Sequence, residues 1–324
     1  MTVNASMKRM ILVVALVVGL TPVAARAQDG KLVDKIAVEF PEAAYAQIET
    51  NFPGTRDIMK SVLLYRITYL SDGLKVKGYL AAPKSGQRLP CVIFNRGGNR
   101  EFGALRDGPA AGMLGRVASW GYVVVASQYR GNAGGEGREE FGGADVNDVL
   151  NLIPVLQSWP QADPSRVGMY GWSRGGMMTY LAITRTTNVC AAVIGAGPTD
   201  LVGWPAGRQD METNVFAQII PGYATNRDAV LQTRSALYWP EKLLPQAPIL
   251  LLHGTADWRV NPTDSLRMAT ALLERKHPFR LVMLEGGDHG LSEHRAEVNR
   301  QVKDWLDQYV RDRKPWPSLE PHGR

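Results

Sequence analysis

Short apolar runs alternate with longer segments of helical periodicity over most of the chain. The apolar runs lie at 91–95, 122–128, 167–171, 190–197, 249–254 and 280–286. Apolar residues recur at the spacing of amphipathic helices in 108–120, 142–158, 174–186, 263–276 and 292–311. Strands that are apolar on both faces and alternate with helices indicate a parallel sheet with helices on both faces.

Two further segments with alternating apolar residues, 64–70 and 74–80, flank a Ser-Asp-Gly turn at 71–73. An Asp-Gly pair between such segments is typical of a β-hairpin. Together with the six apolar runs, the hairpin predicts a mostly parallel, eight-stranded sheet in an α/β fold. We expect the preceding residues, 28–63, to form a mostly helical N-terminal segment.

The alternation of apolar runs and helical segments is interrupted between residues 198 and 239. This stretch of about forty residues is long for a simple connection. This segment contains Trp204 and Phe216 together with several Gly and Pro residues, so we expect a small irregular cap. The catalytic domain would then span residues 64–312, and residues 313–324 would form a flexible tail.

The first 27 residues have the three-part layout of a secretory signal peptide. Lys8 and Arg9 precede an apolar run at 10–20, and Ala-Arg-Ala at 25–27 provides a cleavage site with small residues. The apolar run is shorter than the ~20 residues that cross a bilayer. We therefore expect an exported protein, periplasmic or secreted, that is not bound to the membrane after cleavage.

The net charge changes once this segment is set aside. The chain has 37 Lys and Arg against 31 Asp and Glu, a formal charge of +6. Residues 1–27 contain Lys8, Arg9 and Arg26 but no acidic residue, so the remaining chain has a charge of +3. The sequence has no run of about five basic residues, and nucleic-acid binding is not indicated. An apolar content of 45% with 21% charged residues is typical of a globular protein.

A Gly-Trp-Ser-Arg-Gly sequence at 171–175 joins a predicted strand to a predicted helix. In such a strand-turn-helix elbow the backbone is strained, and the central side chain projects above the sheet. The start of the helix also directs backbone N–H groups towards this point. Ser173 is therefore the candidate nucleophile, and the backbone N–H of Arg174 is a candidate donor to an oxyanion.

A serine hydroxyl needs a base to remove its proton, and a carboxylate must orient that base. His289 follows the last predicted strand in a glycine-rich loop, and His294 at the start of the last helix is the alternative base. Asp257 follows the preceding strand, and Asp200 is the alternative acid. Loops at the carboxyl ends of parallel strands share one edge of the sheet. The chain order Ser173, Asp257, His289 is that of α/β-hydrolases.

Other polar and sulfur-containing residues are assigned structural roles. His253 ends a predicted strand, where turns commonly need a side-chain hydrogen bond. Cys91 and Cys190 lie in strands expected to flank the nucleophile strand, about 9.6 Å apart, which exceeds the roughly 7 Å limit for a disulfide. We expect two buried free thiols. The sequence has no metal-binding His/Cys cluster and no complete dinucleotide motif, so we predict no metal and no cofactor.

Five segments, at 67–83, 127–150, 163–176, 251–260 and 286–290, have sequences typical of one enzyme family. They resemble the catalytic domain of the prolyl oligopeptidase family of serine peptidases. The resemblance implies an α/β-hydrolase fold in which Ser173 is the nucleophile, Asp257 the acid and His289 the base.

The sequence departs from the family pattern at two points. Family members often have a tyrosine before a Gly-Gly pair, with its hydroxyl in the oxyanion hole, whereas this chain has Arg96 before Gly97 and Gly98. Either the Arg96 side chain or a backbone N–H in this loop, such as that of Gly97, would supply the second donor. Larger members also contain a β-propeller, for which 324 residues leave no room.

These observations predict a serine hydrolase that cleaves peptide or ester bonds through an acyl-enzyme. The family resemblance favours a peptidase, while the missing propeller favours a carboxylesterase acting on small esters. A third hypothesis is a non-catalytic binding protein with the same fold. The expected partner is a small peptide or ester substrate, and the sequence does not indicate an oligomeric state.

Overall fold

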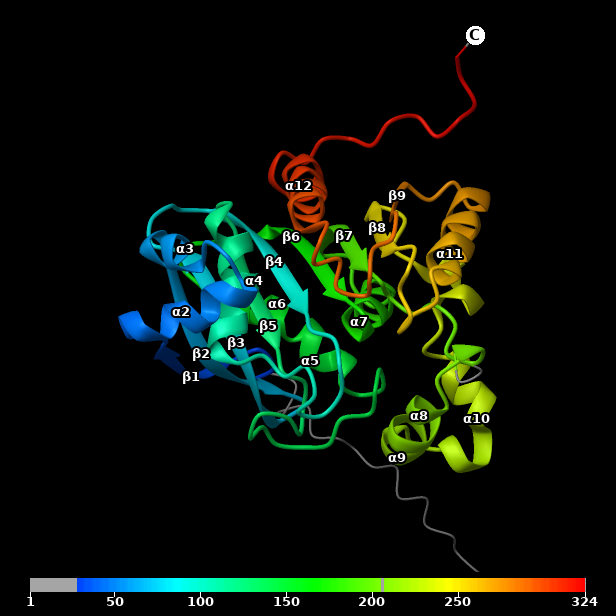
Figure 1. Cartoon of the computed structure of the whole chain (residues 1–324), viewed down its shortest axis with the longest axis horizontal. Coiled ribbons are helices and arrows are strands. Elements are labelled where there is room, and N and C mark those ends of the chain that lie inside the picture. Colours follow the sequence, from blue (N-terminus) through cyan, green and yellow to red (C-terminus); the bar gives the residue numbers. More distant parts are fainter. Residues whose placement is uncertain (1–27, 205–206, 324) are drawn as a thin grey trace, which may run out of the picture.

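A computed structural model describes residues 28–204 and 207–323, and within these ranges the chain forms one nine-stranded sheet (Figure 1). The strands in chain order are β1 (Leu32–Ala37), β2 (Val62–Ser71), β3 (Leu74–Pro83), β4 (Leu89–Asn95), β5 (Val123–Ser127), β6 (Ala162–Trp172), β7 (Val189–Gly195), β8 (Ile249–Gly254) and β9 (Phe279–Leu284). Across the sheet they are ordered β1-β2-β3-β5-β4-β6-β7-β8-β9.

The type of strand pairing changes once across the sheet, from antiparallel to parallel. β1, β2 and β3 pair antiparallel with their neighbours, and β3 pairs antiparallel with β5. All pairs from β5 to β9 are parallel. Every residue of β5 and of β8 is buried, as the continuous apolar runs predict. The loops that follow β4, β6, β8 and β9 therefore meet at one edge of the sheet.

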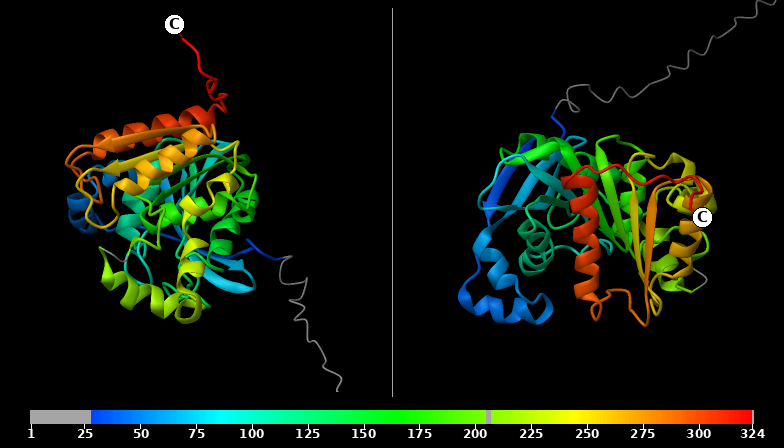
Figure 2. Two further views of the ribbon diagram at one scale, coloured as in Figure 1. Left: turned by 90° about the vertical axis from the view of Figure 1, so that its right-hand side faces the viewer. Right: turned by 90° about the horizontal axis from the view of Figure 1, so that it is seen from above.

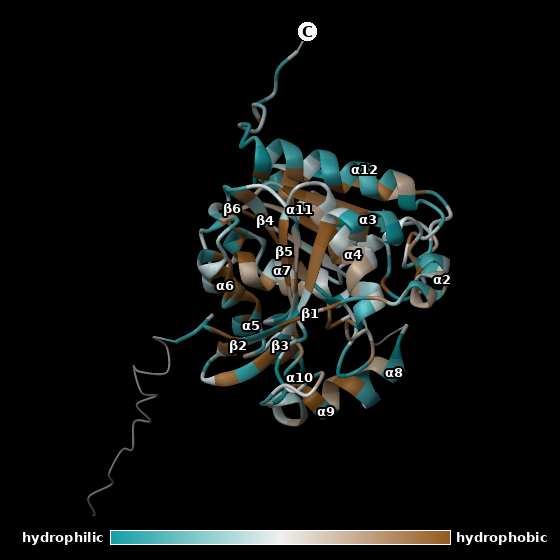
Figure 3. Cartoon of the chain, turned by 90° about the vertical axis from the view of Figure 1, so that its left-hand side faces the viewer, coloured by the Kyte–Doolittle hydropathy of each residue, from teal (hydrophilic) through white to brown (hydrophobic). Residues whose placement is uncertain are grey.

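Helices cover both faces of the sheet (Figure 2). One face packs against α3 (Thr55–Ser61), α4 (Asp107–Ser119) and α12 (Arg295–Leu306). The other packs against α5 (Val146–Leu150), α6 (Leu152–Ser158), α7 (Arg174–Ile183) and α11 (Thr263–Glu274). In Figure 3 the apolar strands lie between these layers, and α12 presents a largely hydrophilic surface. The predicted fold class is confirmed.

The N-terminal segment differs from the prediction, because it begins with a strand. β1 pairs with β2, with Leu32 opposite Tyr69 and Ala37 opposite Tyr65. The predicted count of eight strands was therefore wrong by one. Val33 and Ile36 are about half exposed, at 45% and 52%, so β1 has no buried face to produce an alternating pattern. The rest of the segment is helical, as predicted, in α2 (Glu42–Asn51) and α3.

The cap segment, residues 198–239, contains several short helices. They are α8 (Gln209–Met211), η2 (Glu212–Phe216), α9 (Ala217–Ile219), α10 (Tyr223–Gln232) and η3 (Ala236–Tyr238). Helices α8, α9 and α10 lie together at one end of the molecule (Figure 1). Phe216 is fully buried and packs against Phe141 and Trp204, with ring centroids 5.2 and 5.7 Å apart. Arg100 donates hydrogen bonds to the Asn214 carbonyl and to Gln218, which joins the cap segment to the loop after β4.

The strand order separates the two cysteines as predicted. Cys91 in β4 and Cys190 in β7 flank β6, and both thiols are free. Cys91 is buried, but Cys190 is only partly buried, so the prediction of two buried thiols holds for one of them.

The remaining predictions concern the two ends of the chain, a flexible tail and a signal peptide. Residues 313–323 form neither helix nor strand, and Lys276 Nζ lies 2.6 Å from Glu320. Residues 1–27, on which the predicted signal peptide depends, lie outside the described residues. In the described ranges, every helix is too short or too polar to cross a bilayer.

Candidate active site

Ser173 lies in a tight turn between the end of β6 and the start of α7. Its backbone has φ 57° and ψ −128°, a conformation that non-glycine residues rarely adopt. A side chain at Gly171 would overlap the Gly175 carbonyl, and one at Gly175 would overlap the Asn95 carbonyl. Both flanking glycines are therefore required for the close packing of β6, α7 and β4 at this elbow.

Asp257 and His289 meet from two different loops at the same edge of the sheet. Asp257 follows β8, His289 follows β9, and His289 Nδ1 lies 2.7 Å from Asp257 Oδ2. The second carboxylate oxygen, Oδ1, accepts hydrogen bonds from the backbone N–H groups of Arg259 at 2.8 Å and Val260 at 3.1 Å. The carboxylate is therefore held in one orientation, in which it accepts a hydrogen bond from the Nδ1–H of His289 and leaves Nε2 unprotonated in the neutral ring.

The electrostatics of Asp257 favour its charged form. Burial by itself would raise the pKa of Asp257, but hydrogen bonds from His253 and His289, together with the Val260 N–H, hold that pKa well below its ordinary value. Asp257 is 6% exposed, so water competes little for these bonds. The carboxylate is therefore ionised at neutral pH and can stabilise a protonated His289.

Ser173 and His289 line the same pocket, which has a volume of about 330 Å³. Within the described residues no hydrogen bond joins Ser173 Oγ to the His289 ring. Catalytic hydrogen bonds are often long when no substrate is bound. Apolar side chains, among them those of Phe102, Trp204 and Met211, also line the pocket, together with Arg208 and Arg259. The structure thus brings all three predicted residues, Ser173, Asp257 and His289, to one site.

The two alternative residues are engaged elsewhere. Asp200 Oδ2 forms an ion pair with Arg267 at 2.9 Å. His294 Nε2 lies 3.0 Å from the Glu285 carbonyl. His294 does not line the pocket that contains Ser173, and the carboxylate bonded to His289 is that of Asp257, not that of Asp200.

The loop after β4 passes directly beside Ser173. A Cβ atom placed on Gly97 would lie 3.1 Å from Ser173 Cβ and 3.7 Å from Ser173 Oγ. The Arg96 side chain, in contrast, is 2% exposed and does not line the pocket. Its guanidinium donates hydrogen bonds to the carbonyls of Gly97, Arg100 and Gln128. The interpretation of Arg96 as a side-chain donor to an oxyanion is therefore corrected: its guanidinium holds the loop through hydrogen bonds, and the backbone of Gly97 lies next to Ser173.

A buried ionic network that the sequence analysis missed supports this loop and α7. The Arg174 guanidinium lies 2.7 Å from Glu139 and 2.6 Å from Asp145, and it also donates to the Gly98 carbonyl. It lies over the Tyr129 ring at 4.7 Å. All three charged side chains are at least 95% buried. Glu139 and Asp145 within a glycine-rich loop were visible in the sequence, but only the fold shows that Arg174 is their partner.

His253 lies behind Asp257, in agreement with its predicted hydrogen-bonding role. Its Nε2 is 3.1 Å from both Asp257 Oδ2 and the Val260 carbonyl, and its Nδ1 is 2.7 Å from Ser265 Oγ. Because both partners of Nε2 are acceptors, this nitrogen must carry the proton and donate it. His253 thus adds a further hydrogen bond to the carboxylate that orients His289.

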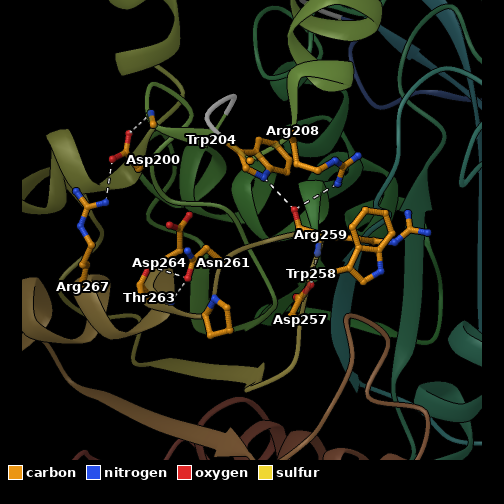
Figure 4. A pocket seen from close by; sticks show the side chains of 13 residues that line it. Asp200, Trp204, Arg208, Asp257, Trp258, Arg259, Asn261, Thr263, Asp264 and Arg267 are labelled. Atoms are coloured by element: carbon orange, nitrogen blue, oxygen red, sulfur yellow. Dashed lines mark hydrogen bonds and ion pairs between the residues drawn. The ribbon is translucent and has the colours of Figure 1, made fainter.

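A second, more polar pocket of about 370 Å³ shares Trp204, Arg208 and Arg259 with the first (Figure 4). The indole Nε1 of Trp204 and the guanidinium of Arg208 both donate to the Arg259 carbonyl, at 2.9 and 3.4 Å. These bonds connect the cap segment to the loop that contains Asp257. In residues 28–204 and 207–323, no three His, Cys, Asp or Glu side chains are grouped as a metal site requires.

Residues 113–313 match the Prolyl oligopeptidase family. The chain belongs to this family. Membership confirms the resemblance seen in the sequence, and with it the prediction of a serine hydrolase on an α/β-hydrolase fold.

Individual proteins that are similar to this chain are also peptidases. The chain is 32% identical over 253 residues to an uncharacterized peptidase, YtmA, of Bacillus subtilis, covering 78% of this chain and 95% of that protein. It resembles the structure of a Mycobacterium tuberculosis puromycin-hydrolyzing peptidase at 27% identity, with a TM-score of 0.60 and coverage of 74% of this chain and 38% of that one. A Pyrococcus horikoshii acylaminoacyl peptidase has the same fold, with 22% identity, a TM-score of 0.67 and coverage of 82% and 45%. The chain thus spans less than half the length of these two solved structures.

Proposed function

We propose that this chain is a serine peptidase that cleaves amide bonds of small substrates through an acyl-enzyme at Ser173. The proposal depends on one observation above all: a serine in a strained elbow and a histidine bonded to a buried carboxylate line one pocket. This combination supplies a nucleophile, a base and a group that stabilises the protonated base.

In the proposed first step, His289 Nε2 accepts the Ser173 proton while Ser173 Oγ bonds to the substrate carbonyl carbon. The negative charge that forms on the carbonyl oxygen is stabilised by the backbone N–H groups of Arg174 and Gly97. Asp257 stabilises the imidazolium through Nδ1. The C–N bond then breaks, His289 gives its proton to the leaving amine, and an ester to Ser173 remains.

The second step repeats this chemistry with water. His289 removes a proton from a water molecule, whose oxygen attacks the ester carbon. The Ser173–carbonyl bond breaks, and the proton returns to Ser173 Oγ. A free acid is released, and the enzyme is restored without any external cofactor.

The pocket supports a substrate with an apolar side chain next to the cleaved bond. Phe102, Trp204 and Met211 provide apolar surface, and a volume of about 330 Å³ lies at the lower end of the usual range for ligand pockets. Peptides and aminoacyl amides of a few residues fit this description. The peptidases among the similar proteins support an amide rather than an ester as the natural bond.

A fluorophosphonate probe, which reacts with activated serines, tests the nucleophile. We expect wild-type protein to be labelled and Ser173→Ala to be unlabelled, while the exposed control Ser292→Ala is labelled like the wild type. Turnover of aminoacyl p-nitroanilides beside short p-nitrophenyl esters then tests the bond. Hydrolysis of the esters with no anilide turnover would replace the peptidase by a carboxylesterase.

We also propose, from residues 1–27 of the sequence, that the protein is exported. The charged start, the apolar run and the Ala-Arg-Ala site support cleavage before Gln28. N-terminal sequencing of the protein from a secreting host should then begin at Gln28. A cytoplasmic protein that keeps its first residues would contradict the proposal.

A further inference from the structure

A large pocket outside the active site lies between α4, α12 and the ends of β4 and β6. Its volume is about 600 Å³, nearly twice that of the pocket with Ser173. Pocket volumes of this size are typical of sites for small organic ligands. The pocket also touches the end of α2 and the loop at 290–292, which directly follows His289.

The floor of this pocket is aromatic. Phe94 and Tyr170 are 5.3 Å apart in an edge-to-face arrangement, and Tyr170 and Trp172 are 6.4 Å apart. Tyr170 and Trp172 are only partly buried, although both belong to a central strand of the sheet. In the part of the chain that the structure describes, the Tyr170 hydroxyl forms no hydrogen bond. The surface is thus suited to an apolar group and offers one free polar group within it.

Two arginines at this pocket donate hydrogen bonds only to backbone carbonyls in the part of the chain that the structure describes. Arg116 of α4 donates to the Pro53 carbonyl, and Arg295 of α12 donates to the Asn51 carbonyl. Neither forms an ion pair within the described residues, and no Asp or Glu lines the pocket. Burial lowers the pKa of Arg116, and the nearby charge of Arg295 lowers it further, although Glu49 offsets part of this effect. Two positive charges therefore share a partly buried site in which a negative charge would be favourable.

We propose that this pocket binds a small carboxylate with an apolar chain or ring. The carboxylate would lie between Arg116 and Arg295, because guanidinium groups bind carboxylates through two parallel hydrogen bonds. The apolar part would cover the Tyr170 and Trp172 rings. The proposed binding site contains none of the residues proposed for catalysis, so it can be tested independently of the peptidase function.

A ligand bound in this pocket would also affect the active site. Trp172 directly precedes Ser173, and its indole Nε1 donates to the His289 carbonyl at 2.8 Å. Gly290 and Leu291, next in the chain, line the pocket. A ligand packed against Trp172 therefore contacts the side chain that holds the His289 loop, and we expect it to change the rate of hydrolysis.

Dodecanoate, titrated calorimetrically below its micelle concentration, is a suitable probe. We expect saturable binding to the full-length protein, at least about tenfold weaker for Arg116→Met and for Arg295→Met, because a charge-assisted hydrogen bond accounts for roughly this factor. Asn299→Trp, which narrows the pocket from α12, should weaken binding without removing a charge. Dodecanol should bind more weakly than dodecanoate.

Matched controls separate this pocket from other sites. Arg300→Met, on the exposed side of α12, and Arg259→Met, in the pocket with Ser173, should bind dodecanoate like the wild type. Protein blocked at Ser173 with a fluorophosphonate should also bind it. Unchanged affinity in both Arg116→Met and Arg295→Met, with circular dichroism confirming their fold, would overturn the proposal.

Two other outcomes are decisive. Dimers in analytical ultracentrifugation that compete with dodecanoate would show that a second copy covers the pocket, and would overturn a small-ligand site. If dodecanoate binds as expected but ester hydrolysis is unaffected at saturation, the binding site is supported and its connection to His289 is wrong.

Discussion

Asp257 and Arg174 are both buried charged residues of the candidate active site, but they have different kinds of partner. Asp257 is surrounded by hydrogen-bond donors, one of which is a titratable ring that faces the pocket. Arg174 is neutralised by two carboxylates that are themselves buried. The comparison separates a charge placed to act on a reacting group from a charge placed to hold loops together.

The largest expected effect concerns the first of these charges. Asp257→Asn keeps the shape of the side chain but can donate a hydrogen bond to His289 Nδ1, which favours the wrong tautomer. We expect kcat to fall by about ten-thousandfold, as for a triad that loses its carboxylate. Steady-state kinetics with a p-nitrophenyl ester measure this loss. Asp228→Asn, on the exposed surface, serves as the control, and a kcat within tenfold of wild type for Asp257→Asn would contradict the assignment.

The second charge should affect stability more than chemistry. Arg174→Leu leaves Glu139 and Asp145 buried without their partner, and such a change typically costs about 3–5 kcal/mol of unfolding free energy. The backbone N–H at position 174 is retained, so the folded fraction should keep measurable activity. Urea denaturation checks the loss, with Arg300→Met as the matched control at about 0.5 kcal/mol or less. A stable but inactive Arg174→Leu would place this guanidinium in the chemistry instead.

A smaller effect is expected where the loop after β4 approaches the nucleophile. Gly97→Ala adds a methyl group 3.1 Å from Ser173 Cβ and from the Trp172 carbonyl, so the loop must shift by a few tenths of an ångström. Misplacement of a catalytic group by about 1 Å can cost a hundredfold, and we expect about a tenfold loss in kcat here. Measurement of kcat and KM distinguishes this from weaker binding. A variant with unchanged kcat would indicate that Gly97 is not a donor to the oxyanion.

The smallest expected effect is the dependence of stability on pH. Because the pKa of Asp257 is lower in the folded than in the unfolded chain, its contribution to stability is present above the ordinary aspartate pKa of about 3.9 and is lost as the pH falls towards the lower folded value. His253→Leu removes one of the bonds that cause this lowering. We expect the variant to lose less stability than the wild type between pH 7 and pH 3.

Urea denaturation at both pH values measures this difference. His253→Gln, whose amide can still donate to Asp257, should behave more like the wild type than His253→Leu does. Equal acid sensitivity of wild type and His253→Leu would show that His253 does not act through the Asp257 carboxylate.

Much of the fold and of the site could be predicted because the signals are local. Continuous apolar runs indicated the parallel strands, since a strand buried on both faces has no polar side. The sequence around Ser173 indicated the elbow, because only glycine at 171 and 175 permits the close packing seen there. Asp257 and His289 each followed a strand by a few residues, and parallel strands bring such loops to one edge.

The remaining features depended on contacts between distant residues. β1 was missed because its exposed residues show no periodic pattern of apolar positions. Its strand conformation depends on pairing with β2. Three features depend on how separate elements pack: the direction of the Arg96 side chain, the pairing of Arg174 with Glu139 and Asp145, and the placement of Arg116 and Arg295 at one pocket. The sequence by itself determined which residues are the candidates for catalysis, because backbone strain and burial act within a few positions. Only the tertiary structure decided which charges meet, because hydrogen bonds and ion pairs depend on distances in space.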